Sequence, residues 1–285
     1  MLEKIRKYRN WYLVPLMFIV IFVLIMLGQI LGMLLMNLVP IKDNDAWETG
    51  SMYLSFIGIW IVFLIYLYTS KRYKKYLVEL TPAKKGNTIG YFLFGLFLGF
   101  VLNGICILIA RLNQDIKLTF DQFEILTALF LLFTVFVQSS AEELVCRGFL
   151  FPLFLDTYKK PWFAMILNAG LFALLHIFNP GMTFLAFLNL LLSGIFFSFL
   201  VYYCDSLWGA MAAHTGWNYT QSILFGLPNS GGVVPYSIFK LDTASAKNSF
   251  AYNVGFGVEA TVVAAIVLTL AIAAIYLLKG KTKEA

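Results

Sequence analysis

Charged residues are scarce in this 285-residue chain, because Asp, Glu, Lys and Arg together make up only 13% of it. A soluble globular protein is about a quarter charged and about half apolar, whereas 60% of this chain is hydrophobic. The composition excludes an ordinary soluble domain and indicates a membrane protein. No stretch interleaves basic and aromatic residues on a polar background, so a nucleic-acid partner is not expected.

Cysteine is also rare. The three cysteines, Cys106, Cys146 and Cys204, lie within or at the ends of apolar segments. None falls in a segment expected outside the membrane, so no disulfide framework is predicted. Cys146 lies one helical turn from Glu142, but no neighbouring residue would activate its thiol, and we interpret it as a packing residue.

Apolar runs long enough to cross the membrane recur along the chain. A span of about 30 Å of hydrocarbon takes about 20 helical residues. The expected spans are 12–38, 51–69, 88–110, 123–145 (continuing to about 156), 162–178, 182–203, 206–227 and 255–278. The predicted fold class is therefore all-α, a polytopic bundle of about eight transmembrane helices with a polar cavity inside the membrane.

Basic residues are distributed unevenly between the two sides of this bundle. With the N-terminus inside, 16 of the 21 Lys and Arg residues fall on that side and five on the other. Cytoplasmic loops are enriched in Lys and Arg, so both termini are expected in the cytoplasm. The basic N-terminus precedes a run too long for a cleaved signal peptide, and we interpret that run as a retained first helix.

Small residues and one long connection mark the organisation of the bundle. Gly28 with Gly32, and Gly95 with Gly99, have the spacing that lets helix backbones approach closely. We interpret both pairs as packing contacts within the bundle. Residues 228–254 are rich in Gly, Ser, Asn and Pro and are expected to form a surface loop outside the membrane.

The stretch SSAEELVCRGFL, residues 139–150, places Glu142, Glu143 and Arg147 in an apolar part of the chain. Ionisable groups at membrane depth are costly and usually functional. Glu143 and Arg147 stand at i,i+4 with the acid first, the better order for an ion pair. Glu142 is turned about 100° away from Glu143. We therefore expect Glu143 and Arg147 to support the site and Glu142 to face it.

Both histidines of the chain lie in apolar spans, and Asn218 follows His214 by one helical turn. A polar turn near residue 159 is midway between Glu142 and His176. An antiparallel hairpin at this turn would bring the two to the same depth, roughly 22 Å along the axis. His214 and Asn218 lie roughly 14–20 Å beyond the next short turn, near 205, and can reach the same level.

A kink and a further acid complete the polar features. Pro152 cannot donate a hydrogen bond to the carbonyl of Gly148, which predicts a kink. Such a kink would open a cavity to cytoplasmic water just below Glu142. Glu259 either faces this cavity or lies near the outer interface, and the sequence leaves both open.

These side chains suit peptide-bond hydrolysis. A glutamate beside a histidine can hold and deprotonate a water, which we assign to Glu142 and His176. A second histidine with an asparagine can donate to a developing oxyanion, which we assign to His214 and Asn218. In a competing interpretation Glu142, His176 and His214 bind zinc with one open position. Because HExxH is absent and the three lie on separate helices, we favour a site without a metal or other cofactor.

Three motifs occur in order along the chain: EExxxR in EELVCR, FxxxH from Phe172 to His176, and HxxxN from His214 to Asn218. Together, on successive membrane helices, they resemble the CPBP family, also called Abi. This family contains CAAX prenyl endoproteases and bacteriocin-processing and bacteriocin-immunity proteins. The resemblance covers about residues 120–230.

The resemblance implies an eight-helix intramembrane endopeptidase of glutamic type, with the same roles for the four candidate residues and a supporting role for Glu143 and Arg147. Residues 1–122 would hold helices 1–3, residues 123–230 the CPBP-type core with helices 4–7, and residues 231–285 the outside loop and helix 8. The expected partners are the lipid bilayer and a membrane-associated peptide or protein substrate. A short, all-membrane chain of this kind is typical of a bacterial cell membrane.

Two other functions stay open. The family also includes members credited with non-catalytic immunity or regulation, whose partner would be a bacteriocin or a sensor kinase. Buried carboxylates and histidines also serve as proton relays in transporters. That class has inverted repeats with broken helices in both halves, which the sequence does not show.

Overall fold

The computed structural model describes residues 12–39 and 44–280, which are almost entirely helical. The α-helices are α2 (Leu13–Asn37), α3 (Asp45–Leu54), α4 (Ile57–Thr69), α5 (Ile89–Leu112), α6 (Ile125–Glu143), α7 (Phe151–Tyr158), α8 (Pro161–Leu175), α9 (Phe184–Cys204), α10 (Leu207–Asn218) and α11 (Val262–Ile275). Shorter 3-10 or π-helical segments are η1 (Lys74–Leu80), η2 (Leu144–Leu150), η3 (Tyr219–Leu224), η4 (Val258–Ala260) and η5 (Tyr276–Gly280). Two short strands, β1 (Leu118–Phe120) and β2 (Phe239–Leu241), pair antiparallel. The predicted all-α class is confirmed.

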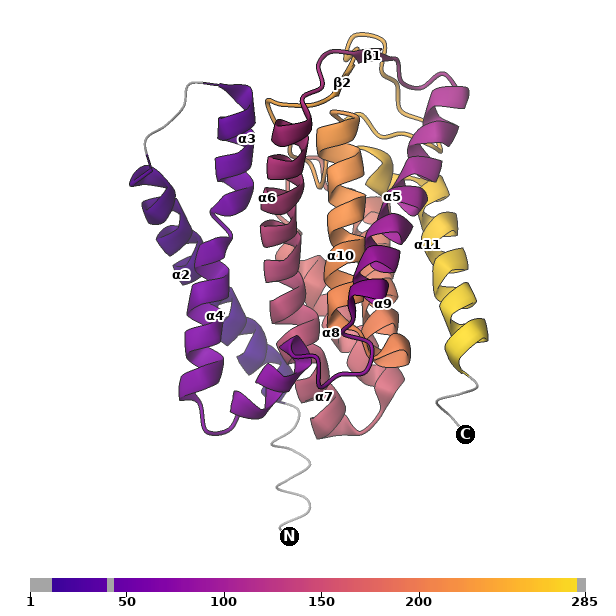
Figure 1. Ribbon diagram of the computed structural model, residues 1–285. Coiled ribbons are helices and arrows are strands. Elements are labelled where there is room, and N and C mark those ends of the chain that lie inside the picture. Colours follow the sequence, from indigo (N-terminus) through magenta and orange to yellow (C-terminus); the bar gives the residue numbers. More distant parts are fainter. Residues whose placement is uncertain (1–11, 40–43, 281–285) are drawn as a thin grey trace.

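The helical elements of the described residues pass back and forth as one bundle (Figure 1). Within residues 12–39 and 44–280, six stretches are long and apolar enough to cross a membrane by length and composition. They are Leu13–Asn37, Asp45–Thr69, Ile89–Leu112, Ile125–Tyr158, Phe184–Cys204 and Val262–Gly280. The shorter α8 and the continuous α10–η3 segment add two more passes, in agreement with the predicted number. The chain is therefore a multi-pass membrane protein.

Two spans begin elsewhere than predicted. The second starts at Asp45 rather than at 51, because the Asn44 side chain caps α3 by accepting from the Trp47 amide at 2.8 Å. The last starts at Val262 rather than at 255. The residues before it form a loop, and the Thr261 side chain caps α11. Polar capping residues thus set boundaries that hydropathy alone does not locate.

The two ends of the bundle differ in charge. We call one end the basic face (70–88, 159–160, 205–206 and the end of η5) and the other the strand face (111–124, 176–183 and 225–261, including β1 and β2; Figure 1). Among the described residues, nine Lys and Arg lie on the basic face and four on the strand face. These are Lys71, Arg72, Lys74, Lys75, Lys84, Lys85, Lys159, Lys160 and Lys279, against Arg111, Lys117, Lys240 and Lys247. Both termini lie outside the described residues. The same holds for the remaining basic residues of the sequence count, which are those in 1–11, Lys42 and those in 281–285.

Glycines let helices of the bundle approach closely, as predicted for both small-residue pairs. A Cβ on Gly99 would overlap the carbonyl oxygen of Ala213, and Gly95 meets α10 in the same way. Gly28 and Gly32 lie against the backbone of the second span. Because α10 packs directly on the backbone of α5, its position along the membrane normal is fixed by backbone contacts rather than by flexible side chains.

π-helical segments directly follow α6 and α10, as η2 and η3. Such segments are frequent at functional sites, and these two begin next to Glu143 and Asn218. In η2 the amide of Phe151 donates to the carbonyl of Cys146. This wider turn directly precedes Pro152. Because proline has no backbone N–H, the carbonyl of Gly148 would lack its hydrogen-bond donor in a regular α-helix.

The cavity expected below Glu142 on the basic side is not there. Residues 143–151 are all buried. A Cβ on Gly148 would lie only 3.2 Å from Cδ2 of Leu207. The prediction of an opening at this position is wrong, because neighbouring side chains rather than water fill the space around the irregular turn.

The connection from η3 to α11 is only partly the surface loop that was predicted. Its strand β2 pairs with β1, with Lys240 opposite Thr119. Tyr252 and Phe256 are fully buried. At Gly231, where φ is +84°, a Cβ would overlap the carbonyl of Pro180. This connection therefore packs onto the bundle and forms a wall at the strand face.

Candidate active site

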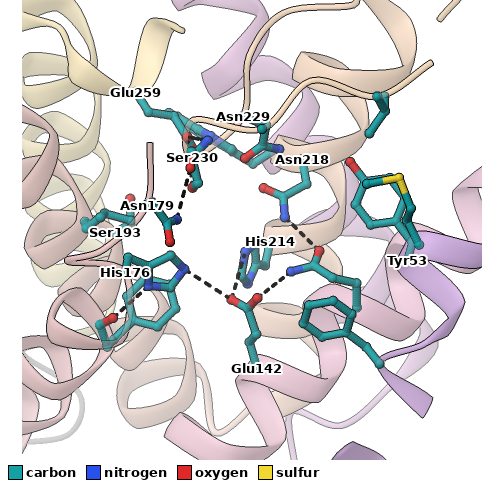
Figure 2. A pocket seen from close by; sticks show the side chains of 18 of the residues that line it. Tyr53, Glu142, His176, Asn179, Ser193, His214, Asn218, Asn229, Ser230 and Glu259 are labelled. Atoms are coloured by element: carbon teal, nitrogen blue, oxygen red, sulfur yellow. Dashed lines mark hydrogen bonds and ion pairs between the residues drawn. The ribbon is translucent and has the colours of Figure 1, made fainter. Parts of the chain in front are cut away.

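Glu142, His176 and His214 come together from three separate helical elements (Figure 2). Glu142 lies in the last turn of α6, His176 caps the C-terminal end of α8, and His214 lies within α10. Oε2 of Glu142 is 3.8 Å from Nε2 of His176 and 4.0 Å from Nε2 of His214. The α7–α8 hairpin turns at 159–160 and brings the first two residues to one level, as the spacing predicted.

Both imidazole rings are oriented through Nδ1. Nδ1 of His176 lies 2.8 Å from the carbonyl oxygen of Phe172, one of the free carbonyls at the end of α8. Nδ1 of His214 lies 3.0 Å from Oε1 of Glu143. An oxygen acceptor at Nδ1 places a proton on that nitrogen, so Nε2 of each ring is the nitrogen that faces Glu142. Phe197 stacks on His214 with the ring centroids 4.9 Å apart.

The Glu143–Arg147 ion pair is present as predicted, at 2.8 Å, with both side chains fully buried. Nη2 of Arg147 donates to the carbonyl of Gly194 at 3.1 Å. The guanidinium lies over the rings of Phe172 and Phe197, with Cζ 4.5 and 5.3 Å from their centroids. Arg147 is one of the 16 basic residues that the sequence count assigned to the cytoplasmic side, but it lies in the interior of the bundle.

A chain of amides joins Glu142 to Asn218. Nε2 of Gln138 donates to Oε1 of Glu142 at 2.5 Å. Nδ2 of Asn218 donates to Oε1 of Gln138 at 3.0 Å and lies 3.3 Å from Oγ of Ser139 (Figure 2). Asn218 thus lies at the site, but its amide hydrogens are directed toward Gln138 and Ser139. The predicted donation to an oxyanion would require this amide to turn.

Glu259 faces the same cavity from the opposite wall (Figure 2), which decides the question that the sequence left open. Its carboxylate accepts from Nε1 of Trp217 at 3.0 Å and from the amide of Ser230 at 2.6 Å. Burial raises the pKa of the Glu259 carboxyl, and these hydrogen bonds oppose the increase. The Glu259 carboxylate therefore connects the loop at Ser230 to Trp217 on α10 through hydrogen bonds, and we interpret Glu259 as a residue that stabilises the cavity wall.

The cavity between these groups has a volume of about 330 Å³. Glu142 lines it on the side of α6, and its apolar lining residues include Phe172 and Phe197. The α3–α4 span contributes Met52, Tyr53 and Phe56. A small apolar chamber with a few convergent polar groups is the usual form of a ligand site, for which roughly 300–1,000 Å³ is typical.

Several polar residues of the cavity were not singled out from the sequence. They are Gln138, Asn179, Ser193, Asn229 and Ser230. Gln138 precedes Glu142 by four residues and shares its helix face, so the i,i+4 rule would have found it. The other four carry no sequence signal of their own, because loop folding and helix packing bring them to the cavity.

No group of three or more His, Cys, Asp and Glu residues in the described part of the chain is arranged to hold a metal ion. Of the three zinc candidates, Oε2 of Glu142 is 3.8 Å from Nε2 of His176 and 4.0 Å from Nε2 of His214. Two ligand atoms of a tetrahedral zinc are about 3.3 Å apart, so these side chains would have to move only slightly closer to share one. Each imidazole does have the Nδ1 partner that is typical of a metal-bound histidine.

Comparison with known proteins identifies this segment of the chain. The family model described as Type II CAAX prenyl endopeptidase Rce1-like matches residues 124–220. The match confirms the resemblance to the CPBP family. It spans α6 to the start of η3 and includes all three motifs. Comparisons with curated proteins and with solved structures gave no match.

This match supports a CAAX-protease-like intramembrane endopeptidase at the level of the family. The matched segment supplies Glu142, His176 and His214. The walls formed by Met52, Val233 and Glu259 lie outside it. These three candidate residues therefore belong to the family segment, whereas part of the cavity around them is formed by the remainder of this chain.

Proposed function

We propose that the protein is an intramembrane endopeptidase that hydrolyses membrane-associated peptides or proteins without a metal ion. The observation that carries this proposal is that one carboxylate oxygen of Glu142 faces Nε2 of both His176 and His214 across a cavity inside the bundle. The test is whether the purified protein cleaves candidate peptides in liposomes, and whether the cleavage depends on Glu142.

In this proposal Glu142 and His176 hold the water that attacks the peptide carbonyl. A water in contact with both Oε2 and Nε2 can pass a proton to the carboxylate as its oxygen bonds to the carbonyl carbon. The carboxylic acid formed can then return the proton to the leaving amine. His176 keeps its orientation throughout, because Nδ1 stays on the carbonyl of Phe172.

His214 is proposed to stabilise the oxyanion of the tetrahedral intermediate. Since its Nδ1 donates to Glu143, a second proton on Nε2 is needed for donation into the cavity. The imidazolium formed in this way has two carboxylates close by, Glu143 at 3.0 Å and Glu142 at 4.0 Å. A donor fixed in this manner in a water-poor site stabilises developing negative charge more strongly than a donor in water.

Chelation distinguishes this mechanism from the zinc alternative. We expect the rate of cleavage to be unchanged after incubation with EDTA and 1,10-phenanthroline followed by gel filtration. The reason is that each proposed proton transfer uses only groups of the chain. Loss of cleavage that added zinc restores, while an equal amount of magnesium does not, would instead assign Glu142, His176 and His214 as ligands.

Gln138 is proposed as a positioning residue that acts through Glu142. We expect Gln138→Leu to lower kcat roughly tenfold to 10²-fold with little change in KM, because a reacting group displaced by about 1 Å can cost about 10²-fold in rate. In a Glu142→Gln background the same substitution is expected to have no further effect on kcat. Single-substrate kinetics on the two single variants and the double variant measure this coupling.

Ser139→Ala is the matched control for this prediction. Ser139 contacts Gln138 and Asn218 but not Glu142, so its loss leaves the 2.5 Å hydrogen bond to the carboxylate in place. We expect its kcat to stay near that of the wild type. An equal loss in both variants, or additive losses in the double variant, would show that Gln138 only supports the fold.

The location of the site depends on the orientation of the bundle. We propose that the basic face lies in the cytoplasm of a bacterial cell membrane, since cytoplasmic connections are enriched in Lys and Arg. The described residues support this with nine basic residues on that face against four on the strand face. Both termini would then be cytoplasmic.

A further inference from the structure

We propose that the substrate reaches Glu142 from the strand face, through an opening rimmed by Met52, Pro180, Gly232 and Val233. The cleaved segment would then belong to the part of a membrane-anchored peptide that lies in the leaflet opposite the basic face. This inference rests on the proposed function and specifies its substrate class. With the basic face in the cytoplasm, the substrate is an extracytoplasmic segment rather than a cytosolic tail.

The exposed residues of the cavity lining define the opening. Val233 is 65% exposed and Met52 49% exposed. Pro180 and Gly232 are exposed as well. Met52 lies on α3, and the other three lie on the two strand-face connections 176–183 and 225–261. The opening is therefore bounded by a helix on one side and by loops on the other, which leaves room for a peptide to enter sideways.

The opposite direction is closed. Beneath Glu142 on the way to the basic face, residues 143–151 are buried. Leu207 and Ala210, at the basic-face end of α10, are also buried. The buried Glu143–Arg147 pair lies in the same direction. A substrate coming from the basic face would have to displace this packed layer, whereas the strand face already has an opening.

The depth of the opening places it within the membrane. α8 has 15 residues, which span about 22 Å, less than the roughly 30 Å of hydrocarbon. The connection 176–183 therefore begins before the strand-face surface is reached. Irregular backbone is tolerated at membrane depth where it lines a cavity. Phe178 within this connection and Phe184 directly after it are 95% and 83% exposed, as expected of residues in contact with lipid.

The chemistry of the route fits an extended peptide. The rim is apolar at Met52 and Val233, as required for a segment that leaves the bilayer. Asn179 and Asn229 then line the cavity. Nδ2 of Asn179 donates to the carbonyl of Ser230 and Nδ2 of Asn229 donates to Oγ of Ser222, each at 3.0 Å. The second N–H of each amide can pair with a peptide backbone. Such groups are needed, because backbone N–H and C=O groups are costly to leave unpaired away from water.

Cysteine accessibility tests the route without a substrate. In a background of Cys106→Ala, Cys146→Ala and Cys204→Ser, one cysteine is introduced at a time: Val233→Cys at the rim, Ser193→Cys inside the cavity, or Lys85→Cys on the basic face. A charged methanethiosulfonate reagent is applied to right-side-out and inside-out vesicles. We expect the rim and cavity cysteines to react at least about tenfold faster in right-side-out vesicles, because the charged reagent hardly crosses hydrocarbon. Lys85→Cys should show the opposite preference.

A bulky residue at the rim tests the opening itself. Met52→Trp is expected to slow modification of the cysteine at 193 and to leave those at 233 and 85 unchanged. Met26→Trp is the matched control, since Met26 is similarly exposed, at 44%, on α2. Monodisperse gel filtration of each variant confirms that it is folded.

The outcomes separate the route from the activity. If the cysteine at 193 reacts from the same side as the one at 85, or is unaffected by Met52→Trp, the proposed route is wrong, whether or not the protein cleaves peptides. If 233 and 193 react only in inside-out vesicles, the extracytoplasmic substrate class is wrong. A third outcome is that labelling follows the expectation while no tested peptide shows cleavage that is present in the wild type and lost in Glu142→Gln. In that case the proposed peptidase function is wrong and the access route is still supported.

Discussion

Replacement of Glu142 by glutamine is expected to lower kcat by about 10²–10⁴-fold, the usual contribution of a general base, with little change in KM. In the wild type, Nε2 of Gln138 donates to Oε1 of Glu142 at 2.5 Å, and the side-chain oxygen of a glutamine at position 142 can accept the same hydrogen bond. The fold and the shape of the cavity should therefore persist. Only the ability to take a proton from water is lost. Cleavage of a membrane-anchored peptide in liposomes, followed by mass spectrometry, measures the effect.

Glu124→Gln is the matched control, because Glu124 precedes the same helix α6 and is exposed. Its turnover should equal that of the wild type. Equal turnover in the Glu142 variant would remove Glu142 from the mechanism. In cells, a phenotype that survives Glu142→Gln at normal expression would favour the immunity or regulatory role, in which binding alone suffices.

The double variant Glu142→Gln with His176→Ala sharpens this result. Groups that act as one unit give non-additive losses, so the double variant should be about as slow as the slower single variant. The 3.8 Å contact between the two side chains supports a shared water. Multiplied losses would indicate two independent roles.

Much of the site could be predicted from spacing within helices and across one turn. The i,i+4 rule predicted the Glu143–Arg147 pair, and the midpoint at residue 159 predicted that Glu142 and His176 would meet. Both arguments work because helix rise and period are nearly constant. The Glu143–Arg147 pair forms even though η2 is π-helical. Glu143 is the last residue of α6, and Arg147 follows it by about one turn in η2.

Features that depend on loops could not be predicted in the same way. Glu259 reaches the cavity because the chain folds back before α11 and binds Trp217 and Ser230. No periodicity encodes that path. The cavity also opens toward the strand face rather than below the kink, because side-chain packing around η2 fills the space that Pro152 was expected to open. Gln138 was overlooked for a different reason, since an uncharged amide is not conspicuous among charged residues.

Replacement of Arg147 by methionine is expected to be the most destabilising of these substitutions, by about 3–5 kcal/mol, because it leaves a buried carboxylate without its partner. Glu143 and Arg147 are both fully buried and 2.8 Å apart. The variant also loses the hydrogen bond to Gly194 and the contacts with two aromatic rings. Unfolding in detergent micelles, followed by circular dichroism, measures the loss. Arg111→Met, an exposed arginine on α5, is the matched control and should change little.

A second variant separates the charge from the packing. In Glu143→Gln with Arg147→Met neither charge remains, and the introduced glutamine side chain still offers an oxygen to Nδ1 of His214, which in the wild type bonds Oε1 of Glu143 at 3.0 Å. Replacing both members of a buried pair is often nearly neutral, so most of the stability lost in Arg147→Met should return. If the double variant is as unstable as the single one, the packing of the guanidinium between Phe172 and Phe197 stabilises the bundle more than the ion pair does. If Arg147→Met is as stable as the wild type, Glu143 is not held as a buried anion, and the imidazolium proposed for His214 loses one of its two counter-charges.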